Sequence, residues 1–108
     1  MPASSHVTDD TFDAEVLQSP ELTIADFWAS WCVPCQRLGP VLEEIATQHA
    51  GNIKVAKLDV DANPRTPERF GVSGLPTMLV FKGGEVVESI VGFMPKDHLL
   101  RKLLPHLN

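Results

Sequence analysis

The chain has two cysteines, and they lie two residues apart in the segment 31–35, Trp-Cys-Val-Pro-Cys. If a helix runs through this segment, the spacing places the two sulfurs one helical turn apart, close enough to form and reopen a disulfide. An apolar segment at 22–29 precedes the pair, and a long amphipathic pattern follows it. A Cys-x-x-Cys pair between a strand and a helix is typical of a redox site. We therefore predict thiol–disulfide exchange.

This chemistry assigns different roles to the two thiols. A thiolate attacks a disulfide and forms a mixed disulfide, which a second thiol then resolves. Cys32 lies at the expected start of a helix, where free backbone N–H groups and the helix dipole lower the pKa of its thiol. Cys35 lies one turn further in, and we expect it to be more buried. We assign Cys32 as the attacking thiol and Cys35 as the resolving thiol.

Two other interpretations of the cysteine pair are inert core packing and half of a zinc site. A structural zinc needs about four ligands. The sequence has no second Cys-x-x-Cys, and its histidines lie far apart, at positions 6, 49, 98 and 106. We therefore predict no metal site.

The composition indicates one domain, residues 1–108, because 108 residues with 44% hydrophobic content suffice for one core. A net charge of −5 without a run of Lys or Arg argues against nucleic acid or an anionic membrane as a partner. No window approaches the roughly 20 apolar residues of a membrane span. The first six residues lack the basic and apolar regions of a secretory signal, which favours the cytoplasm, although a processed secreted form remains compatible with the sequence.

Periodic apolar residues predict eight elements, and two strand–helix–strand units followed by a hairpin predict an α/β sheet with helices on both faces. In chain order the elements are a helix at 8–17 capped by Thr8, a strand at 22–29, a helix from Cys35 to about residue 50, a strand at 53–60, a short helix between residues 64 and 70, strands at 77–81 and 86–91, and a closing helix lined by leucines 99, 100, 103, 104 and 107. We expect Pro40, Pro67 and Pro105 each to distort the helix that contains it.

Asp26 is the one charged residue of the apolar strand at 22–29, where burial of a carboxylate is costly. It is either a proton acceptor for Cys35, kept partly protonated by burial, or an aspartate at a strand edge that faces solvent. Lys57 shares a strand face with Ile53 and Val55 and could lie near Asp26. The simpler interpretation of Lys57 is a solvated lysine.

Nearly the whole chain resembles the thioredoxin family. The matching segments are 7–10, 26–29, 31–32, 34–35, 55–58, 74–77, 81–82 and 84–86. The resemblance implies a thioredoxin fold, with a central mixed sheet flanked by helices on both faces, and a protein-disulfide reductase that works through a reversible Cys32–Cys35 disulfide without a bound cofactor. It implies Asp26 as a buried acid that aids proton transfer, with Lys57 beside it. We assign structural roles to Trp28 and Pro40.

The resemblance also implies a substrate surface. Pro76 would be cis and pack against the active site, and Leu75 would offer backbone hydrogen bonds to an extended client. An apolar rim around the thiols would consist of Trp31, Val60, Gly74, Leu75, Val91, Gly92 and Phe93. Val33 and Pro34 are also assigned to substrate binding. Core or turn positions are the alternative for the rim residues. The implied partners are a thioredoxin reductase and disulfide-containing clients, and we expect a monomer.

Val33 departs from the family pattern, which has glycine at this position. A β-branched residue is stiffer and adds bulk beside the attacking sulfur, so we expect a modest change in redox potential or client choice with activity retained. Pro34, where oxidases and isomerases have histidine, favours a reductant. Alternatives are a reductase dedicated to a single client, tuned by Val33 and Phe93, and a docking module without redox turnover.

Overall fold

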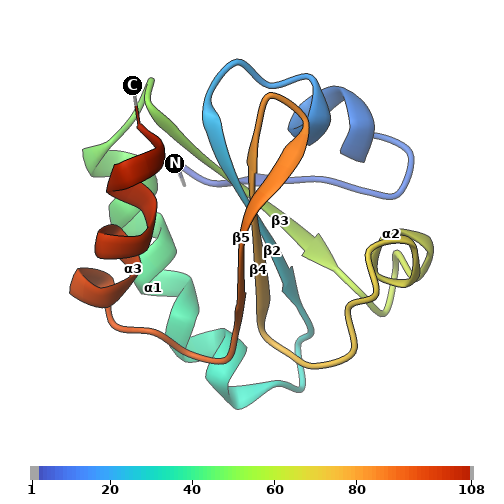
Figure 1. Ribbon diagram of the computed structural model, residues 1–108. Helices are drawn as coiled ribbons and strands as arrows, with labels where there is room; N and C mark the ends of the chain where they lie inside the picture. Colours follow the sequence, from blue (N-terminus) through green and yellow to red (C-terminus); the bar gives the residue numbers. More distant parts are fainter. Residues whose placement is uncertain (1–2, 108) are drawn as a thin grey trace.

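The central element is a five-stranded mixed sheet in the order β1-β3-β2-β4-β5, seen in a computed structural model that describes residues 3–107 (Figure 1). Its middle strand, β2, runs parallel to β3 and antiparallel to β4. The strands are β1 (Ser5–His6), β2 (Leu22–Trp28), β3 (Ile53–Asp59), β4 (Thr77–Lys82) and β5 (Glu85–Val91). The predicted mixed α/β sheet is confirmed.

Helices cover both faces of this sheet. Helices α1 and α3 lie together on one face, and η1 and α2 lie on the other (Figure 1). Their bounds are η1 (Asp13–Leu17), α1 (Val33–Gln48), α2 (Arg65–Arg69), α3 (Lys96–Leu103) and η2 (Leu104–His106). Within residues 3–107, none of these helices combines the length and the apolar character needed to cross a membrane.

Alternation along the strands divides the core into two clusters, because successive side chains point to opposite faces. Leu22 and Ile24 pack with α1 and α3, whereas Ala25 and Phe27 pack on the other face. There Phe12 is fully buried, and its ring centroid lies 6.3 Å from that of Phe27 and 5.8 Å from that of Phe81. The central strand is therefore covered on both faces, as its apolar sequence predicts.

The N-terminal segment differs from the prediction. The Thr8 hydroxyl accepts a hydrogen bond from the backbone N–H of Thr11 at 3.3 Å, as a cap would, but the helix is only the short π-helix Asp13–Leu17. The two-residue β1 was not predicted, because so short a strand has no periodicity. It pairs with β3 and completes the edge of the sheet.

Three later features also differ from the prediction. The second strand–helix–strand unit does not produce a parallel pair, since β4 reverses and joins β2 on its other side. Pro67 lies in the first turn of α2, where no intrahelical hydrogen bond is lost, and α2 is an ordinary α-helix. Leu104 is 49% exposed, so its expected place on the apolar side of the closing helix is wrong. The chain tightens there into η2, which contains Pro105.

Candidate active site

The cysteine pair lies where the central strand gives way to a helix. Strand β2 ends at Trp28, and Cys32 is the N-cap of α1, with φ −92° and ψ 107°. Pro34 follows in the first turn of α1, where a proline costs no hydrogen bond and its fixed φ suits the helix. The sequence thus places Cys32 at the positive end of the helix dipole, as predicted.

The two cysteines form a disulfide, with their Cα atoms 5.2 Å apart. The backbone N–H of Cys35 donates a hydrogen bond to the Cys32 Sγ at 3.2 Å. A donor at this position favours negative charge on the Cys32 sulfur when the pair is reduced. The predicted ability of the pair to close is confirmed.

The expectation that Cys35 is more buried than Cys32 is wrong for this oxidised form. Each residue is 5% exposed, because the bond holds both sulfurs in one small cluster with Ala29. Three partly buried side chains pack against this cluster: Trp28, Val60 and Leu75. Burial therefore does not distinguish the two cysteines, whereas their positions do, with Cys32 at the N-cap and Cys35 in the first turn of α1.

Asp26 lies in the middle of β2 and is 1% exposed. Its Oδ1 has no hydrogen-bond partner among residues 3–107. Burial raises the pKa of Asp26 from 3.8 to about 7, and the charge of Lys57 opposes this rise. The alternative of a solvent-facing aspartate at a strand edge is excluded. A carboxyl group with this pKa exchanges protons readily at neutral pH.

Lys57 lies directly beside Asp26, because the two residues are partners in the parallel register of β2 and β3. Its Nζ is 5.1 Å from the centroid of the Trp28 ring, a cation–π arrangement. Lys57 is therefore not the freely solvated lysine that the sequence alone favours. Trp28 supplies the surface on which the lysine rests, while its own Nε1 is buried without a partner in the described chain.

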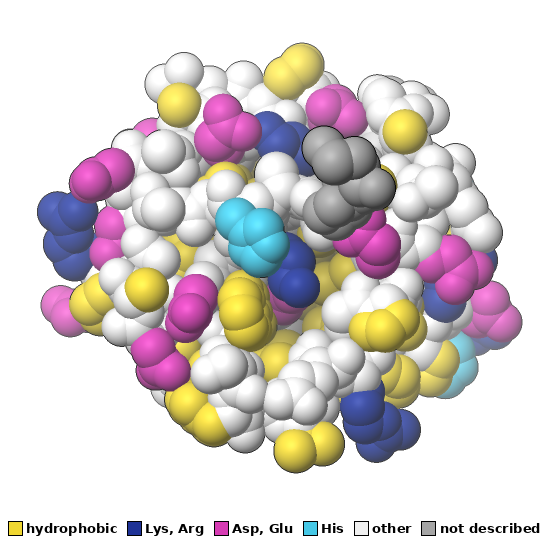
Figure 2. Space-filling model, turned by 180° about the vertical axis from the view of Figure 1, so that it is seen from behind, with side chains coloured by type: hydrophobic (Ala, Val, Ile, Leu, Met, Phe, Trp, Pro, Cys, Tyr) yellow, Lys and Arg dark blue, Asp and Glu magenta, His cyan; other side chains and the backbone are white. Residues whose placement is uncertain are grey.

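The residues assigned to substrate binding include large apolar side chains that are exposed. Trp31 is 66% exposed, Val33 is 62% exposed, and Val91 and Phe93 also face solvent. In Figure 2, hydrophobic side chains gather over the lower part of the molecule, the end at which β2 passes into α1 in Figure 1. Exposed apolar side chains grouped in this way mark a surface for binding another molecule.

Backbone contacts bring further rim residues together. The Leu75–Pro76 peptide is cis, as the resemblance implied, and the Pro76 carbonyl accepts a hydrogen bond from the Gly92 N–H at 2.8 Å. Gly74 lies so close to Val91 that a Cβ on the glycine would be 3.4 Å from a methyl group of the valine. The segment before β4 and the end of β5 therefore lie against each other, and Leu75 of that segment packs against the disulfide cluster.

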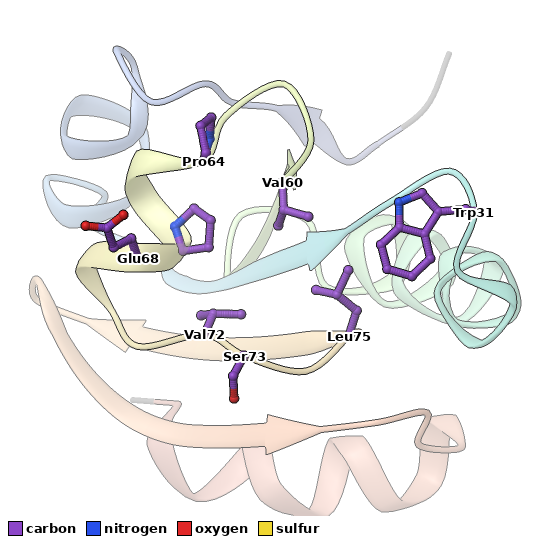
Figure 3. A pocket seen from close by; sticks show the side chains of 8 residues that line it. Trp31, Val60, Pro64, Glu68, Val72, Ser73 and Leu75 are labelled. Atoms are coloured by element: carbon purple, nitrogen blue, oxygen red, sulfur yellow. The ribbon is translucent and has the colours of Figure 1, made fainter.

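A groove with a volume of about 470 Å³ lies beside the disulfide cluster (Figure 3). Its lining includes three predicted rim residues, Trp31, Val60 and Leu75, and five residues from α2 and its flanks that were not predicted: Pro64, Pro67, Glu68, Val72 and Ser73. Three of the five, at positions 64, 67 and 68, have the spacing of one helical face, the only sequence signal that could have indicated them.

Other contacts fix the borders of the site. The Trp31 Nε1 donates a hydrogen bond to the Asp61 Oδ2 at 2.8 Å, which holds the indole ring beside the groove. The Arg37 guanidinium packs over the Phe93 ring, with its central carbon Cζ 5.1 Å from the ring centroid. Pro40 lies in α1, which continues through it to Gln48. In the described part of the chain, no group of three or more His, Cys, Asp or Glu side chains could hold a metal ion.

Sequence comparisons with known proteins all point to one family. The sequence model of the thioredoxin family matches residues 3–104. "Thioredoxin 2" of Chlorobaculum tepidum is 48% identical over 100 residues, which are 93% of this chain and 92% of the relative. "Thioredoxin 1" of Nostoc sp. is 46% identical over 107 residues, 99% of this chain and 100% of the relative. "Thioredoxin" of Streptomyces clavuligerus is 52% identical over 96 residues, 89% of each chain.

The fold, the cysteine pair and the relatives therefore all indicate the same family. The family generally works with thioredoxin reductase and disulfide-containing client proteins, and its members carry no cofactor besides the disulfide. The chain belongs to the thioredoxin family, and it is a thiol–disulfide oxidoreductase that reduces protein disulfides through the redox-active Cys32–Cys35 pair.

Proposed function

We propose that the chain is a general protein-disulfide reductase in which Cys32 attacks the client and Cys35 releases it. The observation that carries this assignment is the hydrogen bond from the Cys35 N–H to the Cys32 Sγ at the start of α1. It stabilises negative charge on the first sulfur and leaves the second sulfur within bonding distance to attack it.

In the first step the Cys32 thiolate attacks one sulfur of a client disulfide. The new Cys32–client S–S bond forms as the client S–S bond breaks, and the first client sulfur leaves as a thiolate that takes up a proton. In the second step Cys35 loses its proton and attacks the Cys32 sulfur. The mixed disulfide breaks and the second client thiolate leaves. The client disulfide has then been reduced by two electrons, and the Cys32–Cys35 pair has been oxidised to a disulfide.

Asp26 is proposed to accept the Cys35 proton in the second step. Its burial and its raised pKa of about 7 support this role, because the group is then close to half ionised at neutral pH. Lys57, its partner across the β2–β3 register, is proposed to limit that rise in pKa by placing a positive charge beside the carboxyl group. Trp28 is proposed to position the Lys57 ammonium through the cation–π contact.

The rim is proposed to bind an extended client segment. Trp31, Val60 and Leu75 would cover its apolar side chains, while the backbone at Leu75 would pair with its main chain. The remaining assigned residues would border the same surface: Val33, Pro34, Gly74, Pro76, Val91, Gly92 and Phe93. We further propose that residues 1–108 act as one monomeric domain in the cytoplasm, where a reducing environment suits a cycling pair, and that a thioredoxin reductase supplies the electrons.

The test is reduction of insulin disulfides with a thioredoxin reductase and NADPH. We expect NADPH consumption and precipitation of the freed insulin chains, both abolished by replacing Cys32 and Cys35 with serine. A parent protein that fails to consume NADPH with the reductase and insulin, or a double variant that keeps the activity, would contradict the proposal. A docking function without redox turnover would survive the double substitution.

A further inference from the structure

We propose that Glu68 makes the groove beside the disulfide selective for client segments that carry a lysine or an arginine. The inference rests on the proposed reductase function, because it concerns which clients present a disulfide to Cys32. It names a specificity-determining residue that lies outside the cysteine pair, on α2.

The groove offers a path from the disulfide to α2. At one end Val60 and Leu75 both line the groove and pack against the cluster that contains the two cysteines. At the other end lies Glu68, on the far side of the groove from Trp31, with Val72 between the two ends (Figure 3). A client bound to Cys32 and extended along this path would pass over apolar side chains before it reaches the carboxylate.

Glu68 is the one charged residue among the eight that line the groove. The two arginines of α2 do not neutralise it, because each is engaged elsewhere: Arg65 pairs with Asp10 at 2.8 Å and Arg69 pairs with Asp13 at 2.7 Å. Among residues 3–107, the exposed Glu68 side chain forms no ion pair or hydrogen bond. Its carboxylate is free to receive a cation from a client.

The surrounding charge has the same sign. Asp61, which accepts the Trp31 hydrogen bond, adds a second carboxylate beside Trp31 but does not line the groove itself. Arg37 rests on the rim residue Phe93 and does not line the groove. The net charge of the chain is −5. A groove with apolar walls and a carboxylate at the end away from the disulfide fits a segment with an aliphatic residue and a basic side chain.

The test measures attack by Cys32 alone on short peptides, in the full chain with Cys35→Ser. Each peptide carries one cysteine as a mixed disulfide with thionitrobenzoate, an aliphatic residue beside it, and lysine, glutamine or glutamate further along, on either side of the cysteine. Attack on the peptide sulfur forms the Cys32–peptide bond and breaks the bond to thionitrobenzoate. That thiolate is the better leaving group because of its low pKa, and its absorbance gives the rate.

We expect the best lysine peptide to react about two- to fivefold faster than its glutamine counterpart, the effect of one exposed ion pair. The glutamate peptide should be slower than both. At about 0.5 M salt the preference for the lysine peptide should disappear, because the Debye length at that ionic strength is only a few ångströms. Equal rates for the three peptides at low salt would overturn the inference.

A matched pair of variants locates the effect. Glu68→Gln should abolish the preference for lysine. Glu85→Gln makes the same chemical change at an exposed position, the first residue of β5, at the opposite end of the sheet, and should keep the preference (Figure 1). A lysine preference that survives Glu68→Gln would also overturn the inference. If no peptide releases thionitrobenzoate, the reductase mechanism itself fails, and the inference fails with it.

Discussion

Replacing Asp26 with alanine should make the protein more stable at alkaline pH while it slows the redox cycle. The carboxyl group is 1% exposed, and its Oδ1 has no hydrogen-bond partner within residues 3–107. Burial therefore disfavours the ionised form, and the pKa of Asp26 rises from 3.8 to about 7 despite the opposing charge of Lys57. A group with a raised pKa in the folded state weakens the fold when it must ionise.

The sign and the size of this change in the free energy of unfolding follow from the protons that the folded and unfolded chains bind. Between about pH 4 and pH 7 the unfolded chain has lost this proton while the folded chain keeps it, so the free energy of unfolding falls by about 1.4 kcal/mol per pH unit. A rise of about three units in pKa gives a total of about 4 kcal/mol. Above pH 7 both states are ionised and the loss is constant. The Asp26→Ala variant has no carboxyl group at this position, so its free energy of unfolding does not fall for this reason. The difference in the free energy of unfolding, variant minus parent, should therefore increase by about 4 kcal/mol from pH 4 to pH 8.

Urea unfolding of the oxidised parent and the variant across this pH range measures the difference. The cavity that alanine leaves has a cost independent of pH, so it cancels when the two ends of the range are compared. Asp97→Asn removes an exposed carboxylate from α3 and controls for the loss of one charge. A difference between Asp26→Ala and the parent that stays constant with pH would refute the buried, largely protonated carboxyl group. Unaltered insulin reduction at pH 7 would remove Asp26 from the mechanism.

Further predictions concern the active-site turn and the core. Val33→Gly should change the redox potential or the insulin-reduction rate modestly with activity retained, because it removes an exposed side chain beside the attacking sulfur; no change in either would refute this. Phe12→Ala should cost about 3–5 kcal/mol in urea unfolding, since the ring is fully buried. Gly84→Ala should cost at least about 1–2 kcal/mol, because Gly84 has φ +83° and a Cβ would lie 3.1 Å from the Leu17 carbonyl oxygen. Gly39→Ala should cost less than Gly84→Ala, because Gly39 lies in α1 without a positive φ and an added Cβ there meets no atom within 4 Å apart from its own helix backbone and its chain neighbours, which include the ring of Pro40; equal effects of the two glycine substitutions would contradict this account.

Most of the sheet could be predicted from local patterns. Strand β2 is apolar on both faces, and α1 carries a stripe of apolar residues. In both elements the residues that the sequence pattern marks as apolar are the ones that the structure buries. The cysteine pair at their junction has both the residue types and the spacing of a redox site. Where pattern and burial coincide in this way, sequence reasoning predicts the element and its place in the core.

The differences arise where contacts distant in sequence decide the structure. The two residues of β1 form a strand because β3 offers them a free edge. The equal burial of Cys32 and Cys35 follows from their shared cluster in the oxidised form, not from their positions in a helix. The groove requires residues of α2 and of the segment after it to lie near Trp31, and no local pattern indicates that packing.

The central claim is that Cys32 attacks and Cys35 resolves, and covalent trapping tests it most directly. The reduced Cys35→Ser and Cys32→Ser variants are each mixed with a disulfide-containing client such as insulin, and adducts are measured by non-reducing electrophoresis and mass spectrometry. We predict a stable mixed disulfide between Cys32 and the client with Cys35→Ser, and little or none with Cys32→Ser. Equal trapping by both variants, or preferential trapping through Cys35, would contradict the account.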